Sequence, residues 1–333
     1  MVKILIVGAG FVGSTLSGWL VNKQYSVRVA DRVRRPLDDR VEFVECDIRD
    51  YDSLRRATEG VDVLIHTAII QIPQVNEEKR LGYEVNVKGT QNVCEAVRES
   101  KSVKGMILTG SWHTIGERNI RGIVDETFGF RPDMVEERAR IYAISKIAQE
   151  SIVRLFGEES SDKIYGVIRI GTTLGPNMPP KTAANIFIDQ ALNGQPLTPY
   201  DYSMHRPMLY AYVNDVCRAF ESYSQKIING TLKATDSSLA HVVNVYYPRP
   251  MTILDLAMTV KRSVTKVSKG KIRPEVKIVK TKQKSAFSSR DKQLIRVNVS
   301  KVREFLGLKK LTSPSEAIEE IVKLRLAQPL PQR

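Results

Sequence analysis

Short apolar runs rich in β-branched residues alternate with longer segments in which apolar residues recur every three or four positions through the first half of the chain. The short runs are typical of strands buried on both faces, and the longer segments of helices with one buried face. Because the two kinds alternate, the pattern predicts an α/β fold with a doubly wound parallel sheet of the Rossmann type and about seven strands. Strands are expected at 2–7, 26–31, 41–46, 61–68, 104–110 and 164–170, and helices at 11–22, 51–59, 77–100 and 137–156.

The alternation becomes irregular after Gly171, where Pro and Gly punctuate the chain. A helix at 213–225 and a strand at 241–247 would return to the main sheet, while later segments would form a smaller C-terminal substrate-binding domain. The pattern therefore predicts a Rossmann domain from 1–170 and about 206–247, with a cap from 171–205 and 248–333 over the C-terminal edge of the sheet. Helices of the cap are expected near 252–264, 300–306 and 313–326.

The bulk composition fits a soluble protein of the cytoplasm. The chain has 333 residues, of which 42% are hydrophobic, enough for a large core and more than one domain. It has no apolar run of 18 residues and no signal-peptide pattern at its start, so neither a membrane span nor secretion is expected. Three widely spaced cysteines and four scattered histidines predict neither disulfides nor a metal site.

The net charge of +14 is concentrated near the C-terminus. Between Lys261 and Lys310 there are 17 Lys or Arg residues and only three acidic residues, so the rest of the chain is balanced. Such a segment could contact nucleic acid, an anionic membrane surface or a phosphorylated substrate. It carries no recognisable nucleic-acid module, so a solvated basic face is the preferred interpretation and nucleic acid is not an expected partner.

The sequence GAGFVG at positions 8–13 follows the first expected strand and opens the first expected helix. Its glycines fit G-x-G-x-x-G, which in this context is a dinucleotide-binding fingerprint. Gly8 and Gly10 would let the backbone turn tightly and approach a pyrophosphate, and Gly13 would allow close helix packing. The N–H groups of Phe11 and Val12, together with the helix dipole, would face the phosphates.

Asp31 ends the second expected strand, 18 residues after Gly13. A carboxylate at this place can accept hydrogen bonds from both hydroxyls of an adenine ribose and would repel a 2′-phosphate, which favours NAD over NADP. Arg32, Arg34 and Arg35 crowd the same place and could reverse the preference.

A second set of residues indicates acid–base chemistry. Tyr142 and Lys146 lie four residues apart, so they share one face of the helix expected there. A nearby ammonium group favours the phenolate, and Lys146 is therefore expected to lower the pKa of Tyr142. Ser111 ends the fifth expected strand, at the sheet edge where open α/β folds gather their ligands.

Several motifs occur in a fixed order: GAGFVG, Asp31, 47-DIRD-50, 65-IHTA-68, 85-VNVKGTQN-92, 109-TGS-111, 142-YAISK-146, 169-RIGTTLGP-176, 212-YVNDV-216 and 297-VNVSKVREFLG-307. Together they resemble the extended short-chain dehydrogenase/reductases, a family of sugar-nucleotide epimerases, dehydratases and 3β-hydroxysteroid-type dehydrogenases. The resemblance covers nearly the whole chain, and the agreement of many motifs makes it specific.

The resemblance implies a role for each matching position. Tyr142 would be the acid/base, Ser111 would hydrogen-bond the reacting oxygen, and Lys146 would bind the nicotinamide ribose. It also implies a homodimer in which the helices carrying Asn86 and Tyr142 pair across a two-fold axis. The implied cofactor-binding residues are Gly8, Gly10, Phe11, Val12, Gly13, Asp31, Arg32, Asp47, Ile48, Thr67, Ala68, Asn86, Tyr142, Lys146 and Ile170.

Departures from the family pattern narrow the reaction. The 4,6-dehydratases follow their serine or threonine with an Asp-Glu pair, and related decarboxylases need a glutamate, but here the positions are Trp112 and His113. Dehydration and decarboxylation by those routes are therefore not expected, whereas epimerases and dehydrogenases need only Ser, Tyr and Lys. His113 is a candidate substrate contact or, equally, a packed or surface residue, and His66 is expected to be a satisfied core residue.

Two further departures concern the substrate. Thr172 stands where sugar-nucleotide enzymes usually have Asn, and Met208 where they have a nucleotide-binding Arg, although Arg206 could substitute if the loop shifts. The sequence predicts an NAD-dependent epimerase or dehydrogenase acting at a secondary alcohol or ketone carbon, preferably of a nucleotide sugar. The substrate contacts would be Ser111, His113, Thr172 and Arg206. The alternatives are a net dehydrogenase or reductase for a non-nucleotide alcohol or ketone, as in hydroxysteroid dehydrogenases, and a non-catalytic NAD(P)-binding regulator.

Overall fold

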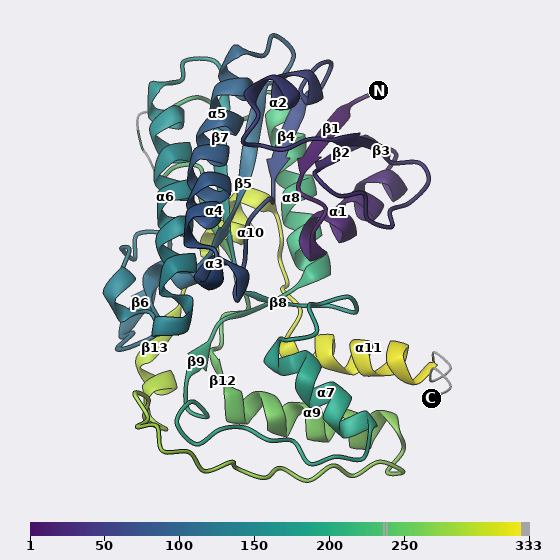
Figure 1. The fold of residues 1–333 in the computed structure, drawn as a ribbon, viewed down its shortest axis with the longest axis vertical. Helices are drawn as coiled ribbons and strands as arrows, with labels where there is room; N and C mark the ends of the chain where they lie inside the picture. Colours follow the sequence, from purple (N-terminus) through teal and green to yellow (C-terminus); the bar gives the residue numbers. More distant parts are fainter. Residues whose placement is uncertain (236, 238, 328–333) are drawn as a thin grey trace.

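The computed structural model describes residues 1–235, 237 and 239–327. Its centre is a parallel sheet of seven strands in the order β11-β7-β5-β4-β1-β2-β3, with helices on both faces (Figure 1). This arrangement confirms the predicted doubly wound fold. The strands are β1 (Lys3–Val7), β2 (Ser26–Asp31), β3 (Glu42–Glu45), β4 (Val63–His66), β5 (Gly105–Ser111), β7 (Ile164–Ile170) and β11 (Val242–Val245).

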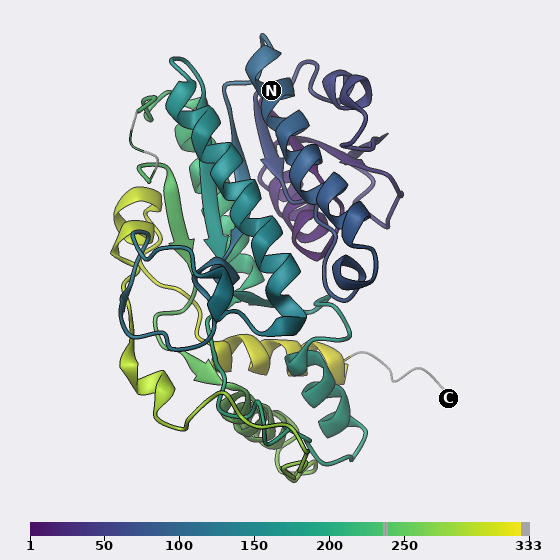
Figure 2. The ribbon, with the colours of Figure 1, turned by 60° about the vertical axis from the view of Figure 1, so that its left-hand side comes forward.

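The residues of β1 show why both faces of the sheet are covered. Ile4 and Ile6 pack into one hydrophobic cluster, and Leu5 and Val7 into the cluster on the opposite face. The first cluster is covered by α1 and α8, and the second by α2, α5 and α6, of which α6 runs the length of the sheet (Figure 2). These helices are α1 (Phe11–Asn22), α2 (Tyr51–Ala57), α5 (Gly89–Glu99), α6 (Glu137–Glu159) and α8 (Val213–Ile228).

The helix expected at 77–100 is not continuous. The chain forms α3 (Gln74–Glu77), α4 (Lys79–Tyr83) and a π-helical turn, η1 (Glu84–Lys88), before α5 begins. The wide π turn contains Asn86, whose side chain is fully buried and bonded to a neighbouring loop. π turns inside helices are frequent where a side chain must meet a particular partner, so the tertiary contacts of Asn86 account for the difference.

A smaller group of helices lies beyond the carboxyl ends of the strands (Figure 1). Its helices α7, α9 and α11 pack on one another, and two short strand pairs, β8–β10 and β9–β12, connect them to the main sheet. A capping box starts α9, because the Thr252 hydroxyl accepts from Asp255 N and the Asp255 carboxylate accepts from Thr252 N. The bounds are α7 (Ala183–Leu192), α9 (Ile253–Val267), α11 (Pro314–Ala327), β8 (Thr172–Leu174), β9 (Pro207–Met208), β10 (Tyr210–Tyr212) and β12 (Met251–Thr252).

The chain returns to the main sheet between α9 and α11. There α10 (Ser300–Leu306) packs against β11 and α8, and β13 (Ile295–Val297) pairs with β6 (Gly122–Val124). The expected cap range 248–333 included α10 and β13, and its last six residues lie outside the described residues. Short 3₁₀ turns complete the fold: η2 (Trp112–Ile115), η3 (Pro132–Met134) and η4 (Asp291–Leu294).

The basic segment 261–310 runs from α9 along the outer edge of the cap to α10 (Figure 1). Part of its charge is neutralised locally, since Lys266, Lys292 and Lys310 form ion pairs with acidic residues of the cap. Within the residues that the structure describes, no helix has the length and apolarity that a bilayer crossing requires.

Candidate active site

A cavity of about 1060 Å³ opens at the carboxyl ends of the parallel strands and reaches the cap. This is the place where open α/β folds bind ligands. Except for Asn86, every residue that the sequence proposed for the site lines this cavity. They are Gly8, Gly10, Phe11, Val12, Gly13, Asp31, Arg32, Asp47, Ile48, Thr67, Ala68, Ser111, His113, Tyr142, Lys146, Ile170, Thr172 and Arg206.

The glycine turn between β1 and α1 is packed against protein atoms at Gly8 and Gly13 and is open to the cavity at Gly10. Gly8 has a φ of +106°, and a Cβ on Gly13 would lie 2.0 Å from the Gly8 carbonyl oxygen, so neither position tolerates a side chain. A Cβ on Gly10 would meet nothing within 4 Å, because this residue faces the cavity. No side chain caps the N-terminus of α1 at Gly10, which leaves its N–H groups for an anion. The turn therefore fits a pyrophosphate.

Asp31 anchors the glycine turn and keeps acceptor capacity for a ligand. Its carboxylate accepts from Ala9 N at 2.6 Å and from Val33 N at 3.2 Å. A carboxylate has about four acceptor positions, so two remain for the hydroxyls of a ribose. The neighbouring Arg32 lies 3.8 Å from Asp47, whose pKa is lowered mainly by its hydrogen bonds from Arg49. The positive charge of Arg32 thus already faces a carboxylate.

Asn86 stands behind the cavity wall. Its Oδ1 accepts from Ile70 N at 2.7 Å, and its Nδ2 donates to Ile70 O and to Ser145 Oγ, both at 3.1 Å. The side chain therefore holds the loop after β4 against α6, next to Tyr142. Thr67 holds the glycine turn against the end of β4 in a similar way, because its hydroxyl donates to Gly8 O at 2.7 Å. Asn86 supports the cavity wall but does not line the cavity.

Lys146 and Tyr142 lie as the spacing predicts, but their electrostatics differ from the expectation. Lys146 is only 2% exposed and donates to Thr109 O at 2.7 Å. Burial lowers its pKa to about 7, although the charge of Glu150 acts to raise it. Burial raises the pKa of Tyr142, and the hydrogen bond with Ser111 opposes this rise. The expectation that Lys146 lowers the pKa of Tyr142 is therefore wrong for the structure as it stands, because Lys146 is turned to a backbone carbonyl and its charge is penalised by burial.

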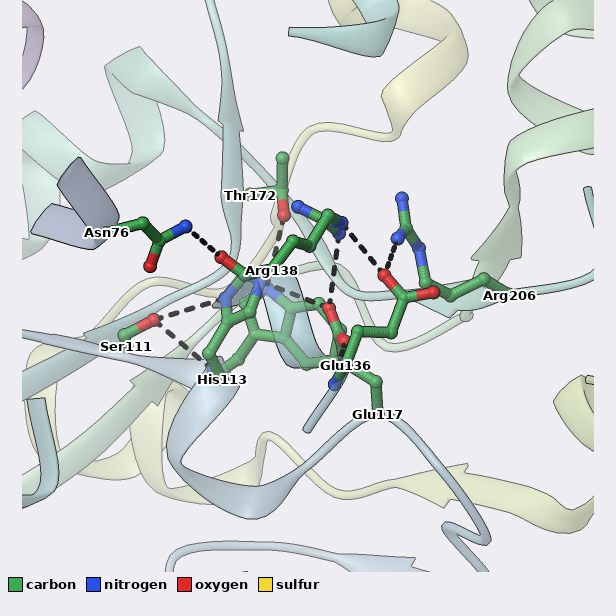
Figure 3. Close-up of polar contacts among 9 residues, drawn as sticks. Asn76, Ser111, His113, Glu117, Glu136, Arg138, Thr172 and Arg206 are labelled. Carbon is green, nitrogen blue, oxygen red and sulfur yellow. Dashed lines mark hydrogen bonds and ion pairs between the residues drawn. The ribbon is translucent and has the colours of Figure 1, made fainter. Parts of the chain in front are cut away.

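His113 joins Ser111 to a buried carboxylate (Figure 3). Its Nδ1 lies 3.4 Å from Ser111 Oγ, and its Nε2 lies 3.3 Å from Glu117 Oε1. Its ring also meets the ring of Tyr142 edge-on, with centroids 5.7 Å apart. The backbone fixes the start of this turn, since His113 N donates to Ser111 Oγ at 3.2 Å. His113 therefore lies at the end of the cavity that Ser111 and Tyr142 also line.

Glu117 is fully buried but ionised. Burial acts to raise its pKa, yet its partners hold the pKa at about 2: the contact with His113 Nε2 first, then the charges of Arg206 and Arg138. Glu136 completes the cluster, because its carboxylate pairs with both Arg206 and Arg138 (Figure 3). Sequence reasoning missed Glu117, Glu136 and Arg138. The only available signal was the four-residue spacing of His113 and Glu117.

Other predicted residues are partly committed to contacts within the protein. The Thr172 hydroxyl accepts from Trp112 Nε1 at 3.1 Å, and one edge of Arg206 is paired with Glu136. His66 lies outside the cavity lining, and its Nε2 is 2.9 Å from Thr90 Oγ1. Its Nδ1 has no partner within the described part of the chain, so this core histidine is only half satisfied, and burial lowers its pKa to about 3.

Comparison with known proteins places this site in context. The model of the NAD dependent epimerase/dehydratase family matches residues 4–233. A provisionally named UDP-glucose 4-epimerase of Methanocaldococcus jannaschii is 29% identical over 242 residues, which are 68% of this chain and 76% of that protein. The decarboxylating sterol-4-alpha-carboxylate 3-dehydrogenase of Bos taurus is 31% identical over 194 residues, which are 57% of this chain and 51% of that protein.

Solved structures share the fold over almost the full length. The UDP-glucose 4-epimerase of Thermus thermophilus, in complex with NAD, superposes with a TM-score of 0.76 at 23% identity. The superposition covers 98% of this chain and 100% of that one. At this identity the similarity shows only the architecture, which is a Rossmann sheet with a cap. The substrate must be inferred from the residues that line the cavity.

Proposed function

Because the chain belongs to the NAD dependent epimerase/dehydratase family, we propose that it binds NAD in the cavity and moves hydride at a secondary alcohol or ketone carbon. The observation that carries this proposal is the shared cavity. The glycine turn and Asp31 line one part of it, and Ser111, Tyr142 and Lys146 line another. A protein that only sensed NAD would not need an acid–base group beside the cofactor, so the regulator alternative is disfavoured.

The residues of this chain divide the work between cofactor and substrate. The turn at Gly8–Gly13 and the N–H groups of α1 hold the phosphates, and Asp31 accepts from the adenine ribose. NAD, when bound, supplies the hydride acceptor and a positive ring that favours the ionised form of Tyr142. Ser111 holds the reacting oxygen near Tyr142, and Tyr142 exchanges its proton with that oxygen.

For the substrate, we propose a nucleotide sugar that is epimerised through a transient ketone. The relative of Methanocaldococcus jannaschii named as a UDP-glucose 4-epimerase supports this class. The start of α7 supports it as well, because Lys181 and the N-cap residue Thr182 line the cavity there. A helix N-terminus beside a lysine is suited to a diphosphate.

A second candidate is an apolar secondary alcohol or ketone oxidised or reduced in net turnover. The cap side of the cavity is mostly apolar, and Arg206 already has an acidic partner, which leaves few groups for a second diphosphate. The dehydrogenase of Bos taurus named for a sterol carboxylate belongs to this class by its name. The apolar wall consists of Leu174, Met178, Pro179, Ala183, Ala184, Ile186, Met208 and Ile253.

Substrate incubation separates the two candidates. The purified protein would be supplied with UDP-sugars, GDP-sugars or hydrophobic secondary alcohols, with and without added NAD, while the absorbance of NADH is followed. Epimerisation gives a new sugar isomer without net NADH, and dehydrogenation accumulates NADH. If neither class reacts under conditions where NAD binds, the proposed hydride transfer is wrong.

Lys181 provides a matched test of the nucleotide-sugar proposal. Lys181→Met should raise the KM for a nucleotide sugar by roughly tenfold, because a lost charge contact costs about 1.4 kcal/mol or more. It should leave the KM for an apolar alcohol within about twofold. Lys309→Met is the control, since Lys309 is exposed and lies outside the cavity lining. An unchanged KM for the nucleotide sugar would argue against a diphosphate at α7.

A further inference from the structure

Helix α6 presents a row of three polar side chains to the cavity. Arg138, Tyr142 and Lys146 follow one another at intervals of four residues, and all three line the cavity. Residues four apart lie on the same face of a helix, with Cβ atoms about 5–6 Å apart. A substrate group bound by Arg138 would therefore lie only a few bonds from the oxygen that Tyr142 serves. Hydride transfer uses Tyr142 and Lys146, but it gives Arg138 no role.

A second arginine reaches the same end of the cavity from the segment that leads into β9. Arg206 lines the cavity although it is only 9% exposed. Glu136 joins the two arginines, because its Oε2 accepts from Arg206 Nη1 and from Arg138 Nε (Figure 3). The two guanidinium groups are therefore held close together at the start of α6.

The acidic partners of these arginines do not face the cavity. Glu136 and Glu117 lie outside the cavity lining, whereas Arg138 and Arg206 are part of it. Glu77 of α3 also lines the cavity, but among the described residues it forms no ion pair with either arginine. A ligand at this end of the cavity therefore meets the guanidinium groups and not the carboxylates that hold them.

Arg206 keeps donors that its acidic partner does not use. Its Nε is buried and has no hydrogen-bond partner in the part of the chain that the structure describes. An unpaired buried donor is unfavourable, and native proteins rarely leave one without a ligand or water. A guanidinium edge such as Nε and Nη2 can bind a carboxylate through two parallel hydrogen bonds, and the bond to Glu136 uses Nη1 instead. A carboxylate would satisfy this edge.

We propose that the substrate carries a carboxylate a few bonds from its reacting carbon, and that Arg206 and Arg138 bind this carboxylate. The inference rests on the proposed hydride transfer and narrows its substrate to a nucleotide-linked sugar acid or, in the second class, an apolar hydroxy acid. A two-bond contact fixes the carboxylate and so orients the reacting carbon. It leaves Ser111 and Tyr142 free to hold the reacting oxygen.

Two pairs of probes that differ by one negative charge test this site. One pair is UDP-glucuronic acid and UDP-glucose, and the other is 3-hydroxydodecanoate and its methyl ester. In whichever pair reacts, the wild type should have a kcat/KM for the acid roughly 10–100-fold above that for the neutral partner, the range for a hydrogen bond to a charged group. Calorimetry with the NAD-bound protein should show the same preference in Kd.

Substitution of the arginines should remove this preference. Arg206→Met and Arg138→Met should each lower it by roughly tenfold, and Arg206→Lys, which keeps the charge without the two-bond edge, should restore only part of it. Arg140→Met is the control, because Arg140 is an exposed residue of α6 outside the cavity lining, and it should keep the full preference. NAD affinity and urea unfolding report whether each variant is folded. Arg138 is nearly half exposed, so its variant is expected to fold even if that of Arg206 does not.

The possible results distinguish the carboxylate site from the reaction. Equal kcat/KM values for acid and neutral partner in the wild type would refute the site while leaving the hydride transfer intact. A full preference for the acid in folded Arg138→Met and Arg206→Met would refute it as well. If none of the four probes reacts although NAD binds, the proposed hydride transfer fails instead.

Discussion

Three glycine substitutions in and beside the turn should separate steric support from cofactor contact. A Cβ on Gly13 would sit 2.0 Å from Gly8 O, so the turn would have to move by on the order of 1 Å. Overpacking of this kind costs about 1–3 kcal/mol, and the displaced turn should also lose NAD affinity. A Cβ on Gly10 meets no atom within 4 Å, so Gly10→Ala should cost at most about 1 kcal/mol, the difference between Gly and Ala at an N-cap.

The two substitutions therefore have different signatures in the same assays, which are urea unfolding for stability and calorimetry for NAD binding. Gly13→Ala should lower both stability and affinity, whereas Gly10→Ala should weaken NAD binding by about tenfold or more with little change in stability. Gly18→Ala is the control, because Gly18 lies inside α1 with open space around it and should gain about 0.5–1 kcal/mol. Wild-type NAD affinity in Gly10→Ala would refute the assignment of the turn to the pyrophosphate.

Three further results are expected. NAD should bind more tightly than NADP in calorimetry, and Asp31→Asn should narrow the difference, because the carboxylate repels a 2′-phosphate; tighter NADP binding would contradict this. The unfolding free energy should rise between pH 7 and 10.5, because the unfolded chain still binds the proton that the folded Lys146, with its pKa of about 7, has released. Lys146→Met should remove this contribution. Equal pH profiles of the two proteins would contradict the prediction. Light scattering at micromolar concentration should give a homodimer, joined through the helical segment that carries Asn86 and through α6, on which Ile144 and Leu155 are exposed. A monomer would contradict this prediction.

The sequence predicted the sheet and most of the cavity because those features depend on local patterns. Helix α1 has the predicted bounds, since a glycine turn must precede it and its buried face repeats within a few residues. Asp31 and Ser111 could be assigned to the site because the end of a parallel strand is itself the binding edge.

What the sequence did not reveal depends on contacts between distant segments. The π turn at Asn86 follows from its bonds to Ile70 and Ser145, which no local pattern encodes. The pKa of Glu117 is lowered first by His113, four residues earlier in the chain, and further by Arg206 and Arg138, which come near it from other elements. The helix spacing placed Lys146 beside Tyr142, but its bond to Thr109 O and its burial decide its charge. Buried electrostatics of this kind require the tertiary structure.

The central claim is that Tyr142, in the cavity that holds NAD, handles the proton when hydride leaves the substrate. Single-turnover reduction of NAD by a true substrate, compared between the wild type and Tyr142→Phe, tests it most directly. Phenylalanine keeps the packing of the ring, so calorimetry should show unchanged NAD affinity while the rate falls by roughly 10²–10⁴-fold, the range for losing an acid–base group. A rate in Tyr142→Phe near that of the wild type would contradict the catalytic assignment.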